Sequence, residues 1–110
     1  MNYQHKDLAN GKWKQLSLLQ QMANIGSEVE RAINWNEKGN REFARLAAGR
    51  ALELFDLTLD AQEKYARKME IARTRELFAD FFYGDNEYKS TKSEWQKYFF
   101  YFTYAVALQK

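Results

Sequence analysis

The stretch "REFARLAAGRALELFDLTL" (residues 41–59) predicts a helix at the centre of the fold. Its apolar residues recur at spacings of three and four and form two stripes on adjacent helix faces. The first stripe contains Phe43, Leu46, Ala47, Leu54 and Leu57, and the second contains Ala44, Ala48, Leu52, Phe55 and Leu59. A helix that is apolar over so wide an arc must be covered on several sides, so we expect other helices to pack around it.

Three more helices are expected, over residues 11–35, 61–83 and 92–109. The chain has no proline and only five glycines, so little interrupts the helical periodicity. Asn40 is the expected N-cap of the helix at residues 41–59, and "DAQE" (60–63) and "TKSE" (91–94) resemble capping boxes before the next two. Short connections between successive helices favour an all-α fold, an antiparallel up-down-up-down four-helix bundle.

A length of 110 residues predicts one domain over residues 1–110, with residues 1–10 as a flexible N-terminal segment. The packing seam of the first helix contains Leu19, Met22, Gly26, Val29 and Ile33. Gly26 costs roughly 1 kcal/mol in helix propensity at this position. We therefore expect its missing side chain to allow a neighbouring helix to approach closely.

Composition and charge exclude several classes of function. A net charge of +2, from 17 basic and 15 acidic residues, gives no reason to expect nucleic-acid binding. Basic residues of the third helix alternate with acidic ones, which is typical of a solvated face: Arg67, Lys68, Arg73 and Arg75 with Glu63, Glu70 and Glu76. No apolar run reaches the roughly 18 residues of a membrane span, and the N-terminus lacks a signal-peptide pattern. We therefore expect a cytoplasmic protein that does not enter the membrane.

Metal and cofactor motifs are scarce. The chain has no cysteine, and its single histidine is His5 in the polar N-terminal segment, so zinc and di-iron sites are not expected. There is no glycine-rich phosphate loop, and we expect no cofactor. The sequence "ELFD" places Glu53 and Asp56 on one helix face. This pair resembles half of the magnesium site in all-α nucleotide pyrophosphatases, although the matching upstream half is missing.

Two charged residues interrupt apolar stripes. Arg50 falls on the first stripe of the helix at residues 41–59, and Glu76 falls on the main stripe of the third helix, which contains Tyr65, Met69, Ala72, Ala79 and Tyr83. A buried charge needs a partner, so we predict that Arg50 contacts Glu76.

Glu53, Arg73 and Asp80 lie near this predicted pair along their own helices. Three interpretations remain. The pair is a structural ion pair that sets helix register, or one of its residues reaches solvent. Alternatively, Arg50 and Arg73 bind a small anionic ligand while Glu76 acts as a base.

The fourth helix contains "KYFFYFTYAVAL" (97–108), which has two apolar faces. Trp95, Tyr98, Phe99, Phe102 and Val106 form a face that suits the core, and Phe100, Tyr101, Tyr104 and Leu108 lie on the opposite side. The second face would form a larger exposed apolar patch than a monomer usually has. Aromatic residues are enriched at protein interfaces, so we predict a homodimer through this helix.

Other occupants of this second face are an N-terminal segment carrying Tyr3, Leu8 and Trp13, an apolar ligand, or a membrane surface. The membrane surface is disfavoured because an interfacial helix needs a basic polar face. The helix offers little positive charge beyond Lys92, Lys97 and Lys110.

Three segments resemble a group of short, uncharacterised prokaryotic helical proteins: "GRALELFDLTLDA" (49–61), "RELFADFFYGDNEYKST" (75–91) and "WQKYFFYF" (95–102). They fall within the last two-thirds of the chain. The resemblance implies an α-helical bundle and carries no activity. It also points to the polar loop "GDNEYKST" (84–91), whose Asp85, Asn86 and Tyr88 are candidate binding residues.

Two functional hypotheses follow. The first is a non-enzymatic, dimeric helical bundle that acts as an interaction or accessory protein, with a possible unidentified protein partner. The second is a protein that binds a small anionic ligand or nucleotide, or a metal-dependent nucleotide hydrolase. It would use Arg50 and Glu76, or Glu53 and Asp56.

Overall fold

The computed structural model describes residues 11–109, and the predicted flexibility of residues 1–10 lies outside this range. The elements of this range are four α-helices and one short 3₁₀ helix. They are η2 (Trp13–Gln15), α1 (Leu18–Glu37), α2 (Arg41–Ala61), α3 (Tyr65–Phe82) and α4 (Lys92–Leu108). No residue in the range forms a strand. The predicted all-α four-helix bundle is confirmed.

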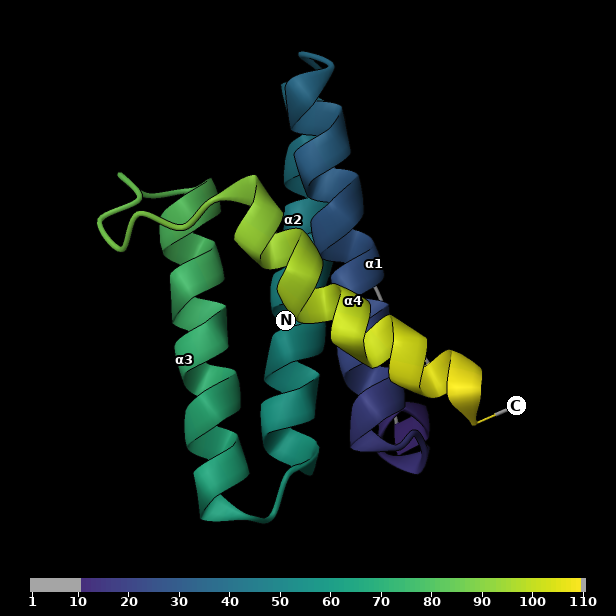
Figure 1. Cartoon of the computed structure of the whole chain (residues 1–110). Helices are drawn as coiled ribbons and strands as arrows, with labels where there is room; N and C mark the ends of the chain where they lie inside the picture. The colour runs from purple at the N-terminus through teal and green to yellow at the C-terminus, as the bar shows by residue number, and fades with distance from the viewer. Residues whose placement is uncertain (1–10, 110) are drawn as a thin grey trace.

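The four helices alternate in direction, but they are not all aligned (Figure 1). Helices α1, α2 and α3 run side by side, whereas α4 crosses the bundle obliquely (Figure 1). Helix α1 packs against both α2 and α4, and α2 also packs against α3. The central position predicted for α2 is therefore shared with α1, which lies between α2 and α4.

Side-chain caps define several helix ends. Asn40 Oδ1 accepts a hydrogen bond from the backbone N–H of Phe43 (3.0 Å), as predicted. Thr91 and Glu94 form the predicted capping box at the start of α4. The predicted cap at Asp60 is wrong, because α2 continues to Ala61 and α3 begins only at Tyr65.

The first helix starts seven residues later than the predicted residue 11. Ser17 Oγ accepts from the backbone N–H of Gln20 (3.1 Å), and Gln20 Oε1 accepts from that of Ser17 (2.9 Å). This capping box begins α1 at Leu18. The preceding chain folds onto the core, where the Trp13 indole N–H donates to Thr58 Oγ1 (2.9 Å). Trp13 is only 2% exposed, so it belongs to the core rather than covering the outer face of α4.

The core lies where α1, α2 and α4 meet and extends to one face of α3. Its fully buried side chains include Trp13, Ile25, Val29, Phe55 and Phe78. The inner face of α3 consists of Ile71, Thr74 and Phe78. The predicted main stripe of α3 is therefore wrong: Tyr65, Met69 and Tyr83 are exposed. Helix α3 packs chiefly against α2, so one narrow apolar face suffices.

Gly26 marks the closest approach of α1 and α4. A Cβ added at Gly26 would lie 2.7 Å from Phe99 Cβ and 2.9 Å from Phe99 Cγ and Cδ1. Carbon atoms in contact are normally about 3.5–4.0 Å apart, so no side chain fits here without movement. The close helix approach predicted at Gly26 is confirmed.

Candidate functional site

Arg50 is paired, but with a different residue from the one predicted. Its Nε donates to Glu28 Oε2 (3.0 Å), and Arg31 Nη1 donates to Glu28 Oε1 (3.0 Å). Glu28 is buried, whereas the Arg31 side chain is 60% exposed and that of Arg50 28% exposed. Among residues 11–109, no ion pair joins Arg50 to Glu76. The predicted Arg50–Glu76 pair is wrong because the helix face that carries Glu76 is turned to solvent.

Glu76 and Asp80 instead organise the loop between α3 and α4. The Tyr88 hydroxyl donates to Glu76 Oε1 (3.2 Å), and the negative charge of Glu76 raises the Tyr88 pKa. Asp80 Oδ1 accepts from the backbone N–H of Glu87 (2.9 Å), and Oδ2 accepts from that of Tyr88 (3.1 Å). Asn86 has a positive φ of 53°, and its side chain bonds both the N–H and the carbonyl oxygen of Ser90. These contacts define a compact polar loop.

Asp56 of the Glu53 and Asp56 pair is engaged by an arginine of α3. Asp56 Oδ1 accepts from Arg75 Nε (2.7 Å), and Asp56 Oδ2 accepts from Arg75 Nη2 (3.3 Å). Glu53 is half-buried on α2, and Arg73 is exposed on α3. In the described part of the chain, no group of three or more acidic or histidine side chains could hold a metal ion. The ligand-binding role of Arg50, Glu53, Arg73, Glu76 and Asp80 stays a prediction.

The predicted second face of α4 is open to solvent. Phe100 is 65% exposed, Tyr101 64%, Tyr104 55% and Leu108 67%. On the opposite side of the helix, Trp95 and Phe99 are each only 5% exposed. We call the four exposed residues together the α4 outer face. With about 150–250 Å² of surface per aromatic side chain, its three aromatic residues leave roughly 280–460 Å² in solvent.

Neighbouring rings pack against the aromatic side chains of the α4 outer face. Phe100 and Tyr104 stack with their ring centroids 6.0 Å apart and an interplanar angle of 23°. The Tyr101 ring meets Phe102 edge-on at 5.3 Å. Such packing restricts the side chains, and restricted side chains lose less conformational entropy when a partner covers them.

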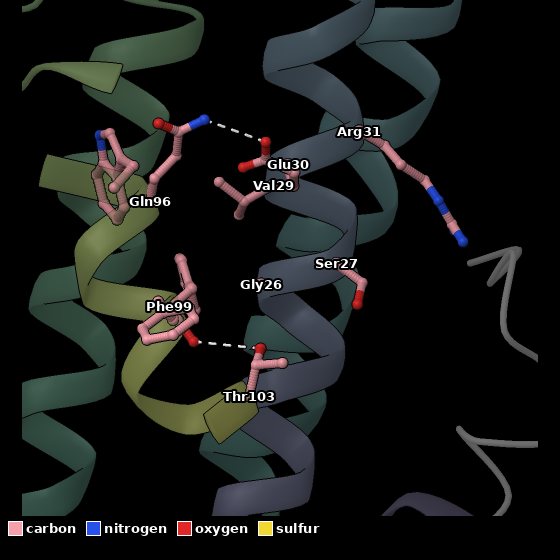
Figure 2. A pocket seen from close by; sticks show the side chains of 10 residues that line it. Gly26, Ser27, Val29, Glu30, Arg31, Gln96, Phe99 and Thr103 are labelled. Carbon is pink, nitrogen blue, oxygen red and sulfur yellow. Dashed lines mark hydrogen bonds between the residues drawn. The ribbon is translucent and has the colours of Figure 1, made fainter. Parts of the chain in front are cut away.

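An open groove of about 540 Å³ runs between α1 and α4 beside this face. Figure 2 shows Gly26 opposite Phe99 in the groove and the Arg31 side chain pointing away from α4. Gln96 Nε2 donates to Glu30 Oε1 (3.1 Å) across the groove, joining the two helices. The Thr103 hydroxyl donates back to the Phe99 carbonyl oxygen of its own helix (3.3 Å). The groove therefore exposes few polar groups that are not already engaged.

No protein-family model, curated protein or solved structure matches this chain. Within residues 11–109, none of the helices has the length and apolar character required to cross a membrane.

The spacing of residues in the first helix indicates that Glu28 is buried. Glu28 lies on one helix stripe with Gln21, Ile25 and Ala32, all of them buried. A charge on that stripe requires a buried partner, in the same way as Arg50 does. Matching the two interrupted stripes of α1 and α2 would have identified the Glu28–Arg50 pair. The sequence prediction also left Lys97 out of the α4 outer face. Lys97 is exposed and lies three residues before Phe100 and four before Tyr101, which places it on the same side of the helix.

Proposed function

We propose that the protein is a non-enzymatic homodimeric interaction module, and that two copies associate through the α4 outer face. The observation that carries this proposal is the exposure of 55–67% at all four residues of that face. Large apolar side chains gathered on one helix face are a usual mark of a protein interface. More than half of each of these side chains lies outside the core of its own chain, so packing within one chain does not explain why this face is apolar.

The area of the face supports a second copy as the occupant. In a symmetric dimer the same patch is buried on both chains. The three aromatic residues would then contribute roughly 560–920 Å² in total. Leu108 and the rim of the patch add to this area. The sum approaches the roughly 1,000 Å² of a specific interface.

Several polar side chains in and beside the candidate ligand site already have structural contacts. Glu28 binds Arg50, Asp56 binds Arg75, and Asp80 holds the loop before α4. A ligand would have to displace these contacts, each of which joins two separate segments of the fold. This favours the interaction role over the alternative of an anion- or nucleotide-binding protein.

The proposal is tested by replacing Phe100 and Tyr104 with serine in one double variant. Burial of each ring is worth about 1 kcal/mol at this degree of exposure, and a dimer contains four such rings. We expect dimerisation to weaken by about 4 kcal/mol, or close to 1,000-fold in the dissociation constant, by sedimentation velocity.

Tyr65→Ser is the matched control, because Tyr65 is 76% exposed on α3, away from α4. This control should dimerise like the unmodified chain, and circular dichroism should show the same helix content in all three proteins. A double variant that dimerises as tightly as the control would overturn the proposed interface.

A further inference from the structure

Lys97 lies on the same helix face as the α4 outer face. At about 100° per residue, Lys97, Phe100, Tyr101, Tyr104 and Leu108 all fall within roughly 100° of arc, with Lys97 near its centre. Lys97 is exposed, and none of the ion pairs within residues 11–109 includes it. The face therefore has a positive charge at its N-terminal end and Leu108 at its C-terminal end.

The geometry points to an antiparallel pairing of α4 with α4 of a second copy, in which Lys97 lies at the C-terminal end of the partner helix. This inference rests on the proposed dimer and specifies its orientation. When Lys97 is opposite the partner's Leu108, Tyr101 is opposite the partner's Tyr104. One register thus pairs both ends and the centre of the face at once.

The C-terminal end of α4 can interact favourably with a positive charge, and its own last turn supplies none. The last turn contains no basic residue, and Lys110 lies outside the described residues. The last carbonyl groups of a helix lack intrahelical donors and carry a partial negative charge. An ammonium group from the partner would interact favourably with them.

A parallel pairing lacks this complementarity. It would place Lys97 beside the partner's Lys97, and like charges at that spacing repel. It would also align the two helix dipoles side by side in the same direction. The interaction of Lys97 with the helix end therefore favours the antiparallel arrangement.

A spin-label distance tests the orientation. The chain has no cysteine, so Ser93→Cys introduces a unique labelling site. Ser93 is exposed, one turn before Lys97. In the antiparallel register, the two Ser93 positions are separated by about 28 Å along the helix axes, or about 30 Å overall. In a parallel dimer they would be about 10 Å apart.

Pulsed electron paramagnetic resonance on the labelled full chain should give a distance near 30 Å. A dimer with strong short-range broadening, as expected at about 10 Å, would overturn the antiparallel inference and leave the proposed dimer intact. A labelled chain that sediments as a monomer, like the unlabelled chain, would overturn the proposed function and this inference with it.

Lys97→Gln tests the charge contact separately. Two symmetry-related contacts are lost in the dimer, so we expect the dissociation constant to rise roughly 3- to 30-fold at low salt. High salt should reduce this difference. Lys68→Gln on α3 is the charge-matched control and should leave the dissociation constant unchanged. An equal effect of the two substitutions would contradict a role for Lys97 at the interface.

Discussion

Replacing Gly26 with alanine tests how closely α1 and α4 pack. The new Cβ would lie 2.7 Å from Phe99 Cβ. A Cβ atom moves only with its backbone, so no rotamer of Phe99 relieves this contact and the two helices must separate. Overpacking of this kind costs about 1–3 kcal/mol, whereas alanine gains about 1 kcal/mol of helix propensity over glycine. Because the contact is so short, the cost of overpacking should lie in the upper part of this range. We therefore expect Gly26→Ala to lower the free energy of unfolding by about 1–2 kcal/mol.

Thermal unfolding followed by circular dichroism measures the effect. A loss of this size corresponds to a fall in melting temperature of roughly 5–10 °C. All samples should have the same protein concentration, because dimerisation makes the melting temperature concentration-dependent. Ser27→Ala is the matched control: it is the next residue of α1, it is exposed, and its substitution adds no contact. The control should be as stable as the unmodified chain or slightly more stable.

The reasoning would be refuted if Gly26→Ala were stabilising by the amount of the propensity gain. That result would mean that α4 crosses α1 with room for a methyl group. A graded series provides a second check, because Gly26→Val should be less stable than Gly26→Ala.

Two further substitutions test the buried polar contacts. Glu28→Ala removes the carboxylate bound by Arg50, so we expect urea unfolding to show a loss of about 1–3 kcal/mol. Arg31, the exposed ion-pair partner of Glu28, gives the comparison: Arg31→Ala should lower the free energy of unfolding by less than about 1 kcal/mol. Equal losses for Glu28→Ala and Arg31→Ala would contradict the importance of burial. Trp13→Phe removes the indole donor to Thr58 and should cost about 1–3 kcal/mol in the same assay. Unchanged stability would mean that this hydrogen bond contributes nothing to anchoring the N-terminal turn.

Features that depend on a few neighbouring residues were predictable from the sequence. The Asn40 cap and the Thr91–Glu94 capping box follow from residue type and spacing alone. The role of Gly26 follows from its place on an apolar seam. The exposure of the α4 outer face follows from a helix that is apolar on both sides, one of which the bundle already covers.

The choice between two similar helix faces was not predictable in this way. Helix α3 has one stripe with Tyr65 and Met69 and another with Ile71 and Phe78, and both contain large apolar residues. Only packing against α2 decides which stripe is buried. The wrong choice also placed Glu76 in the core, and the pairing with Arg50 followed from that error.

The start of α1 was missed for a different reason. The seam that predicted this helix begins only at Leu19, and no helix-start signal was assigned to the residues before it. The competing signal was Ser17 followed by Gln20, a capping box that ends the preceding turn. The position of Trp13 then depends on a long-range hydrogen bond to Thr58, which no local pattern reveals.

The mass of the unmodified chain in solution tests the central claim most directly. Sedimentation equilibrium at micromolar concentration should give twice the chain mass of 13.1 kDa, with dissociation on dilution. A single species of 13.1 kDa at every concentration would contradict the account, because the α4 outer face would then remain uncovered in solution.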